Sequence, residues 1–200
     1  MRLSLKYIGV LLIVALCLSA VYTVWQQNWS NLFVIIQAII LSIIPYVLEY
    51  RYDIHISEKL RVGIVAFIFS TLFLGEINHF YDQYYWWDAA LHFMAGVGLT
   101  LVGFVLLSAI YTMSNLRSTP ALTTLFAFSF TAMVASLWEV YEFSIDQLGW
   151  AENLMQVNGT DTMIDIIVSF VGSLIVCIGG YRYLKRGEKN QAGQILDEMC

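Results

Sequence analysis

The chain has 200 residues and a formal net charge of −5; 59% of its residues are hydrophobic and 12% are charged. Soluble domains carry about 25% charged residues, so this composition excludes an ordinary soluble domain. The sequence also lacks a basic patch for nucleic acid, a phosphate-binding loop and a Ser–His–Asp-type motif.

Six apolar stretches follow one another along the chain, separated by short connections. They are residues 7–25, 32–50, 62–80, 88–111, 121–145 and 162–184. A helix that spans a bilayer needs about 20 predominantly apolar residues. The sequence therefore predicts an all-α polytopic membrane protein. Residues 1–186 are expected to form one bundle of six transmembrane helices, and residues 187–200 a polar cytoplasmic tail.

The first stretch follows two basic residues, as a signal peptide would. It continues to Trp25 without a small-residue cleavage site, so we expect it to be a retained helix. All ten Lys and Arg residues lie before the first stretch, between the second and third, between the fourth and fifth, or at the end of the sixth. Positively charged loops stay in the cytoplasm. Both termini are therefore predicted to be cytoplasmic.

The acidic residues on the opposite, outer side have no basic residue beside them. Carboxylates near a low-dielectric medium must protonate, contact water or bind a cation. Several stand three or four residues from another acid or a histidine, a spacing that places both on one helix face. The pairs are Glu76 with His79, Asp88 with His92, Glu139 with Glu142, and Asp161 with Asp165.

Small residues continue the faces of three of these side chains. Gly96 and Gly103 share the face of His92, Ala132, Ala135 and Ser136 share the face of Glu139, and Gly172 and Gly179 share the face of Asp165. Small residues mark positions where membrane helices approach closely. We therefore expect the acids to point into the bundle, with Asp88, His92, Glu139 and Asp165 in one cluster and Glu76 or Glu142 adjacent.

This pattern is compatible with a divalent metal site. Carboxylates with an imidazole suit Zn, Mn or Fe, and a carboxylate-only subset suits Mg or Ca. The predicted metal ligands are Asp88, His92, Glu139, Asp165, Glu76 and Asp161, and the candidate catalytic bases are Glu142 and His79. Two interpretations need no metal: carboxylates that hydrogen-bond and titrate, and helix ends solvated by water.

Three segments resemble a known family of membrane proteins. They are WWDAALHFMAGVGLTLVGF, WEVYEFSIDQLG and DTMIDIIVSFVGSLI, in this order. Over residues 75–180 they resemble the YjdF-like family of bacterial inner-membrane proteins, a domain of unknown function. The resemblance implies a multi-pass protein of the bacterial inner membrane and supplies no activity.

A looser similarity links the chain to VanZ-like membrane proteins, which pair an Asp with a His-Phe four residues on, as Asp88 and His92 do here. Those proteins also carry an acidic motif in a middle helix and a later Asp ahead of a Gly, and they are associated with low-level glycopeptide resistance and envelope processes. Their usual Glu-x-x-Gln and following Arg are absent, because Glu142 stands in place of the Gln. The resemblance therefore does not imply resistance.

Three functions follow from these observations as alternatives. The first is a metal-dependent enzyme at the outer leaflet, acting on a lipid-linked or envelope substrate. The second is a transporter of protons or divalent cations, and the third is a non-catalytic membrane scaffold or sensor. Membrane lipids are the expected partners, and the sequence leaves homo-oligomer formation open.

Overall fold

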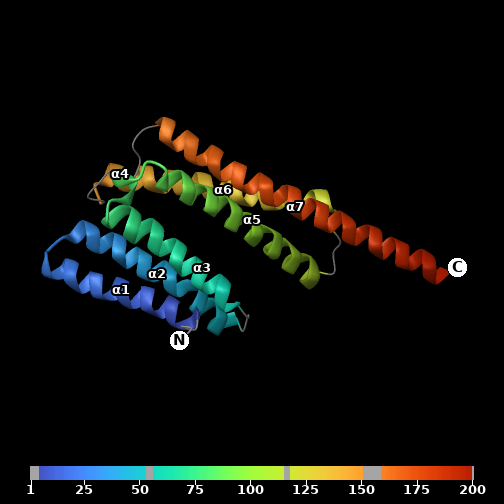
Figure 1. Cartoon of the computed structure of the whole chain (residues 1–200), viewed down its shortest axis with the longest axis horizontal. Helices are drawn as coiled ribbons and strands as arrows, with labels where there is room; N and C mark the ends of the chain where they lie inside the picture. Colours follow the sequence, from blue (N-terminus) through green and yellow to red (C-terminus); the bar gives the residue numbers. More distant parts are fainter. Residues whose placement is uncertain (1–4, 53–55, 115–117, 151–158, 200) are drawn as a thin grey trace. The chain divides into compact units, whose positions relative to one another are not determined.

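The computed structural model describes residues 5–52, 56–114, 118–150 and 159–199 (Figure 1). Within these residues, all of the regular secondary structure is helical. The elements are α1 (Leu5–Trp25), α2 (Trp29–Tyr52), α3 (Glu58–Ile68), the π-helix η1 (Phe69–Ile77), α4 (Phe80–Gln83), α5 (Trp87–Ser114), α6 (Pro120–Leu148) and α7 (Gly159–Met199). Six stretches are long and apolar enough to cross a membrane, and α3 with η1 forms the third. The predicted six spans are confirmed at this level.

Helix α7 continues past the predicted end of the last span. Its backbone is helical to Met199, so the predicted polar tail at residues 187–200 is an extension of the same helix over its described part. Arg2 and Arg117, two of the basic residues behind the orientation argument, lie outside the described residues. The cytoplasmic location of both termini stays a prediction.

The chain divides into two compact units. The first comprises Met1–Asp88 and Glu142–Val157, and the second comprises Ala89–Tyr141 and Asn158–Cys200. The boundaries cut through two continuous helices, α5 and α6, which therefore contribute residues to both units. The arrangement of all six spans in one bundle stays a prediction.

In the first unit, α1, α2 and α3 contact one another. Leu16, Ile35 and Val65, one from each helix, are fully buried. At one end of α2, Arg61 of α3 donates a hydrogen bond to Glu49, and its guanidinium lies 4.9 Å from the centre of the Tyr46 ring. Because both side chains of this ion pair are largely buried, it ties α2 to α3.

The third span changes its helical form halfway along. The α-helix ends at Ile68, and residues Phe69–Ile77 form a π-helix, in which backbone hydrogen bonds join residues five positions apart. A Cβ atom added to Gly75 would lie 2.4 Å from the ring of Tyr81, so glycine allows that ring to fold back against η1. The predicted third span is therefore present as Glu58–Ile77, but within it the chain changes from an α-helix to a π-helix, and it then turns at His79, where φ is 58°.

In the second unit, glycines bring three helices into close contact. A Cβ atom on Gly96 would lie 2.1 Å from the Ser169 carbonyl oxygen, and one on Gly172 would lie 2.5 Å from that of Phe93. A Cβ atom on Gly103 of α5 would lie 2.9 Å from the Cα atom of Ala127 in α6. Backbones that approach this closely leave no room for a side chain, as the small-residue pattern predicted.

Two of the predicted packing positions are wrong. A Cβ atom on Gly179 would meet nothing within 4 Å, whereas one on its neighbour Gly180 would lie 2.5 Å from the ring of Phe104. Ser136 is exposed, and Ala135 is the buried small residue on that turn of α6. The contacts of α5 with α7 therefore follow a slightly different face near the end of the unit.

A layer of three hydroxyl groups lies inside this unit. Thr100 of α5 hydrogen-bonds to Thr131 of α6 at 2.9 Å and to Ser173 of α7 at 2.7 Å, and all three residues are fully buried. The Thr100 and Thr131 hydroxyls also contact carbonyl oxygens of their own helices. The layer therefore joins three helices in a region where the bilayer offers no water.

Thr100→Val should reduce stability, because it keeps the side-chain volume and removes the central hydroxyl. Interhelical hydrogen bonds in membranes contribute roughly 0.6 to 1.7 kcal/mol each, so we expect a loss of about 1 kcal/mol. Reversible unfolding in mixed micelles measures the free energy of unfolding. Ser108→Ala is the control, since Ser108 is exposed and its hydroxyl donates to the Phe104 carbonyl oxygen of its own helix. Equal losses in the two variants would contradict a stabilising layer.

Candidate functional site

Two carboxylates and one imidazole lie together near the first turns of α5 and α7. One ligand atom from each of Asp88, His92 and Asp165 lies within 4.8 Å of the other two. His92 and Asp165 are 7% and 4% exposed, and Asp88 is partly exposed. Asp88 is the last residue of the first segment of the first unit, and the continuous helix α5 carries it one turn before His92.

Close packing of α5 against α7 creates this cluster. Gly96 and Ser169, whose backbones meet, stand one helical turn after His92 and Asp165 respectively. The Ser169 hydroxyl also donates a hydrogen bond of 3.1 Å to the backbone oxygen of His92. This hydrogen bond and the glycine contact determine the position of α7 along α5. His92 therefore lies opposite Asp165.

Glu139 of α6 lies beside the same histidine. Its Oε1 atom is 3.8 Å from Nδ1 of His92, and the residue is 5% exposed. Ala135 and Thr131 follow at four-residue steps along the same buried face of α6. Glu139 therefore lies next to the cluster, but it is not one of the three residues grouped by their ligand atoms.

The cluster lies close to the ends of its helices. His92 is five residues into α5 and Asp165 six residues into α7, which corresponds to a depth of roughly 8 to 9 Å. The hydrocarbon core of a bilayer is about 30 Å thick. If each span begins at the start of its helix, the cluster lies in the third of the core nearest to one membrane surface. Asp161, one turn earlier in α7, is partly exposed.

The other predicted residues are not members of this group of three. Glu76 in η1 and Glu142 in α6 are 5% and 8% exposed, and both belong to the first unit. Nδ1 of His79 lies 3.5 Å from Oδ2 of Asp82, and the His79 side chain is 46% exposed. The three-residue group includes none of Glu76, His79, Glu142 and Asp161 within the described part of the chain. Three of the six predicted metal ligands, Asp88, His92 and Asp165, therefore lie together in this group, and the roles predicted for the other residues stay predictions.

Ser169 and the hydroxyl layer were not predicted. Each helix carries a column at four-residue steps: His92, Gly96 and Thr100 in α5; Glu139, Ala135 and Thr131 in α6; and Asp165, Ser169 and Ser173 in α7. In each column an ionisable residue is followed, two turns further along the buried face, by a hydroxyl. A search for polar and small residues at four-residue steps would have found these columns. The prediction for α7 instead followed glycines seven residues apart, and it therefore selected Gly179.

Comparisons with known proteins support the membrane assignment. The sequence profile of the family described as "Predicted membrane protein (DUF2238)" matches residues 5–186. An uncharacterized protein of Thermotoga maritima is 27% identical over 128 residues, which cover 64% of this chain and 65% of that protein. No solved structure matches the chain. Because the profile matches most of the chain, the chain belongs to the DUF2238 family of predicted membrane proteins.

Proposed function

We propose that this protein binds a divalent cation through Asp88, His92 and Asp165 near one face of the membrane. The observation that carries the proposal is the convergence of their three ligand atoms to within 4.8 Å. Two ligand atoms that each lie about 2.1 Å from a tetrahedrally coordinated zinc ion are about 3.4 Å apart. Rotations of the side chains that bring the three atoms closer together would therefore let them bind one ion.

The chemistry of the ligands narrows the choice of ion. An imidazole with two carboxylates suits Zn²⁺, Mn²⁺ or Fe²⁺, whereas Mg²⁺ prefers an all-oxygen shell. Metal-bound histidines usually direct their second ring nitrogen to a carboxylate or carbonyl oxygen. Glu139, beside Nδ1 of His92, is the carboxylate in this position. We assign it to orienting the histidine, with Glu76 and Asp161 outside the coordination shell.

The reaction that we propose is hydrolysis of an envelope or lipid-linked substrate. A cation at this depth would activate water or polarise a phosphoryl or carbonyl oxygen. Glu142, one turn beyond Glu139 on the same helix and 8% exposed, is the proposed general base. His79 is the weaker candidate, because its side chain is half exposed and lies beside Asp82.

The hydroxyl layer disfavours a transport path through the second unit. Thr100, Thr131 and Ser173 fill the space between the three helices two turns beyond the cluster, and none is exposed. The backbone contact between Gly103 and Ala127 lies next to this layer. An enzyme open to one side of the membrane is therefore the function that the geometry supports best.

We place this enzyme in a bacterial inner membrane with cytoplasmic termini, following the charge pattern and the YjdF-like resemblance. The VanZ-like similarity adds only an envelope setting.

Purified protein should retain close to one Zn, Mn or Fe ion per chain by elemental analysis. Asp88→Asn combined with Asp165→Asn should abolish this binding, because two of three ligands lose their charge. Asp82→Asn combined with Asp146→Asn removes the same charge from residues outside the cluster and should retain the metal. The metal-site proposal fails if the wild type retains no ion after incubation with each metal, or if the two double variants retain equal amounts of metal. The non-catalytic scaffold would then be the remaining function.

A further inference from the structure

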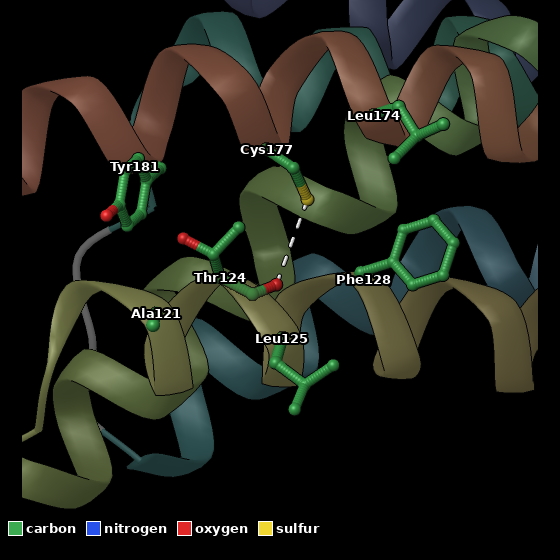
Figure 2. A pocket seen from close by; sticks show the side chains of 7 residues that line it. All are labelled: Ala121, Thr124, Leu125, Phe128, Leu174, Cys177 and Tyr181. Atoms are coloured by element: carbon green, nitrogen blue, oxygen red, sulfur yellow. Dashed lines mark hydrogen bonds between the residues drawn. The ribbon is translucent and has the colours of Figure 1, made fainter.

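A groove between α6 and α7 lies at the opposite end of the second unit from the His92 cluster. Figure 2 labels the residues that line it: Ala121, Thr124, Leu125 and Phe128 of α6, and Leu174, Cys177 and Tyr181 of α7. Its volume is about 340 Å³, at the lower end of the range for ligand-binding cavities. The α6 wall runs from Ala121 to Phe128, which is about 10 Å along that helix.

The middle of the lining presents apolar surface, because the polar groups of Thr124 and Cys177 are already hydrogen-bonded within the protein. The Thr124 hydroxyl donates to the Pro120 carbonyl oxygen at 2.7 Å. The Cys177 thiol, which is buried in the groove, lies 3.8 Å from the Thr124 carbonyl oxygen (Figure 2). Leu125 and Leu174 are 61% and 49% exposed along its edges. A hydrocarbon chain is the occupant that this surface suits.

Positive charge lies at one end of the groove. The ammonium group of Lys185 is 5.5 Å from the centre of the Tyr181 ring, which lines the groove. Arg182 and Arg186 are exposed on the adjacent turn of α7. The start of α6, at Pro120, is at the same end of the groove, and its helix dipole adds partial positive charge. An anionic group is therefore favoured at the end nearest Tyr181.

We propose that this groove binds an anionic phospholipid, with an acyl chain between α6 and α7 and the phosphate beside Lys185. An apolar groove that continues into a cationic end has the same order of chemistry as the chain and headgroup of such a lipid. The positive-inside rule places this end in the cytoplasmic leaflet, which carries anionic lipids. The site is independent of the proposed metal site, and neither result depends on the other.

Native mass spectrometry of protein released from nanodiscs tests this proposal. The discs contain phosphatidylglycerol and phosphatidylcholine with identical acyl chains in equal amounts. The wild type should retain one phosphatidylglycerol preferentially. Lys185→Gln should reduce that preference about fivefold, the effect expected of one basic residue at an anionic membrane. Lys59→Gln, which removes an exposed lysine from the first unit, should leave the preference unchanged.

A second pair of variants tests the groove itself. Ala121→Trp fills the groove and should reduce retention of both lipids, whereas Leu122→Trp places the same ring on an exposed residue outside the lining and should not. Equal retention of the two lipids by the wild type would contradict the preference for an anionic headgroup. Unchanged lipid retention in Ala121→Trp would contradict binding in the groove. A dimer that dissociates in Ala121→Trp but persists in Leu122→Trp would show that a second copy occupies the groove instead of a lipid.

Discussion

A single methyl group added at Gly96 is expected to separate α5 from α7. In Gly96→Ala the new Cβ atom would lie 2.1 Å from the Ser169 carbonyl oxygen, far inside van der Waals contact. The obstructing atom belongs to the backbone, so no side-chain rotation relieves the overlap and one helix must move. Overpacking of this kind costs about 1 to 3 kcal/mol, and we expect a loss near the upper end.

Gly98→Ala is the matched control for this prediction. It makes the same substitution two residues away on the same helix, where the added Cβ atom meets nothing within 4 Å. Alanine is a better helix former than glycine by about 0.5 to 1 kcal/mol, so this variant should be neutral or more stable. Unfolding of both variants in mixed micelles measures the difference. If Gly96→Ala is as stable as Gly98→Ala, the close packing of α5 on α7 is wrong.

The sequence predicts the spans well because their signal is additive along the chain. Hydropathy summed over about 20 residues identifies a transmembrane helix without any knowledge of its neighbours. The π-helix at Phe69–Ile77 escapes this method, since the same apolar residues satisfy either hydrogen-bonding pattern. Its local signal is weak: Gly75 stands six residues before the Tyr81 ring that packs on it.

The partial success at the site has a geometric reason. Small residues on the face of His92 and Asp165 indicate which sides of α5 and α7 meet, and Gly96 and Gly172 confirm that choice. They do not indicate how far the contact continues, because that depends on the crossing of the two helices. Gly179 lies just beyond the contact face, where Gly180 meets Phe104 instead.

Removal of the His92 imidazole is expected to have the largest effect on metal binding. His92→Ala deletes the nitrogen ligand between two carboxylates, so affinity for Zn²⁺ or Mn²⁺ should fall by more than about 100-fold, beyond the range for outer-shell residues. Glu139→Gln keeps the shape of the neighbouring side chain and removes its charge. If Glu139 orients His92 from 3.8 Å without binding the ion, this variant should lose about 10- to 100-fold.

Thermal-shift titrations with Zn²⁺, Mn²⁺ and Mg²⁺ separate these two roles, because a bound ion raises the melting temperature according to its affinity. His79→Ala is the control for His92→Ala, since it removes the same imidazole from a half-exposed position outside the cluster. Asp146→Asn is the control for Glu139→Gln, since Asp146 lies two turns nearer the end of α6 and is partly exposed. Both controls should keep the wild-type shift. A metal-induced shift in His92→Ala equal to that of His79→Ala would show that the imidazole at position 92 is not a ligand, and a loss in Glu139→Gln as large as that in His92→Ala would place the glutamate in the coordination shell.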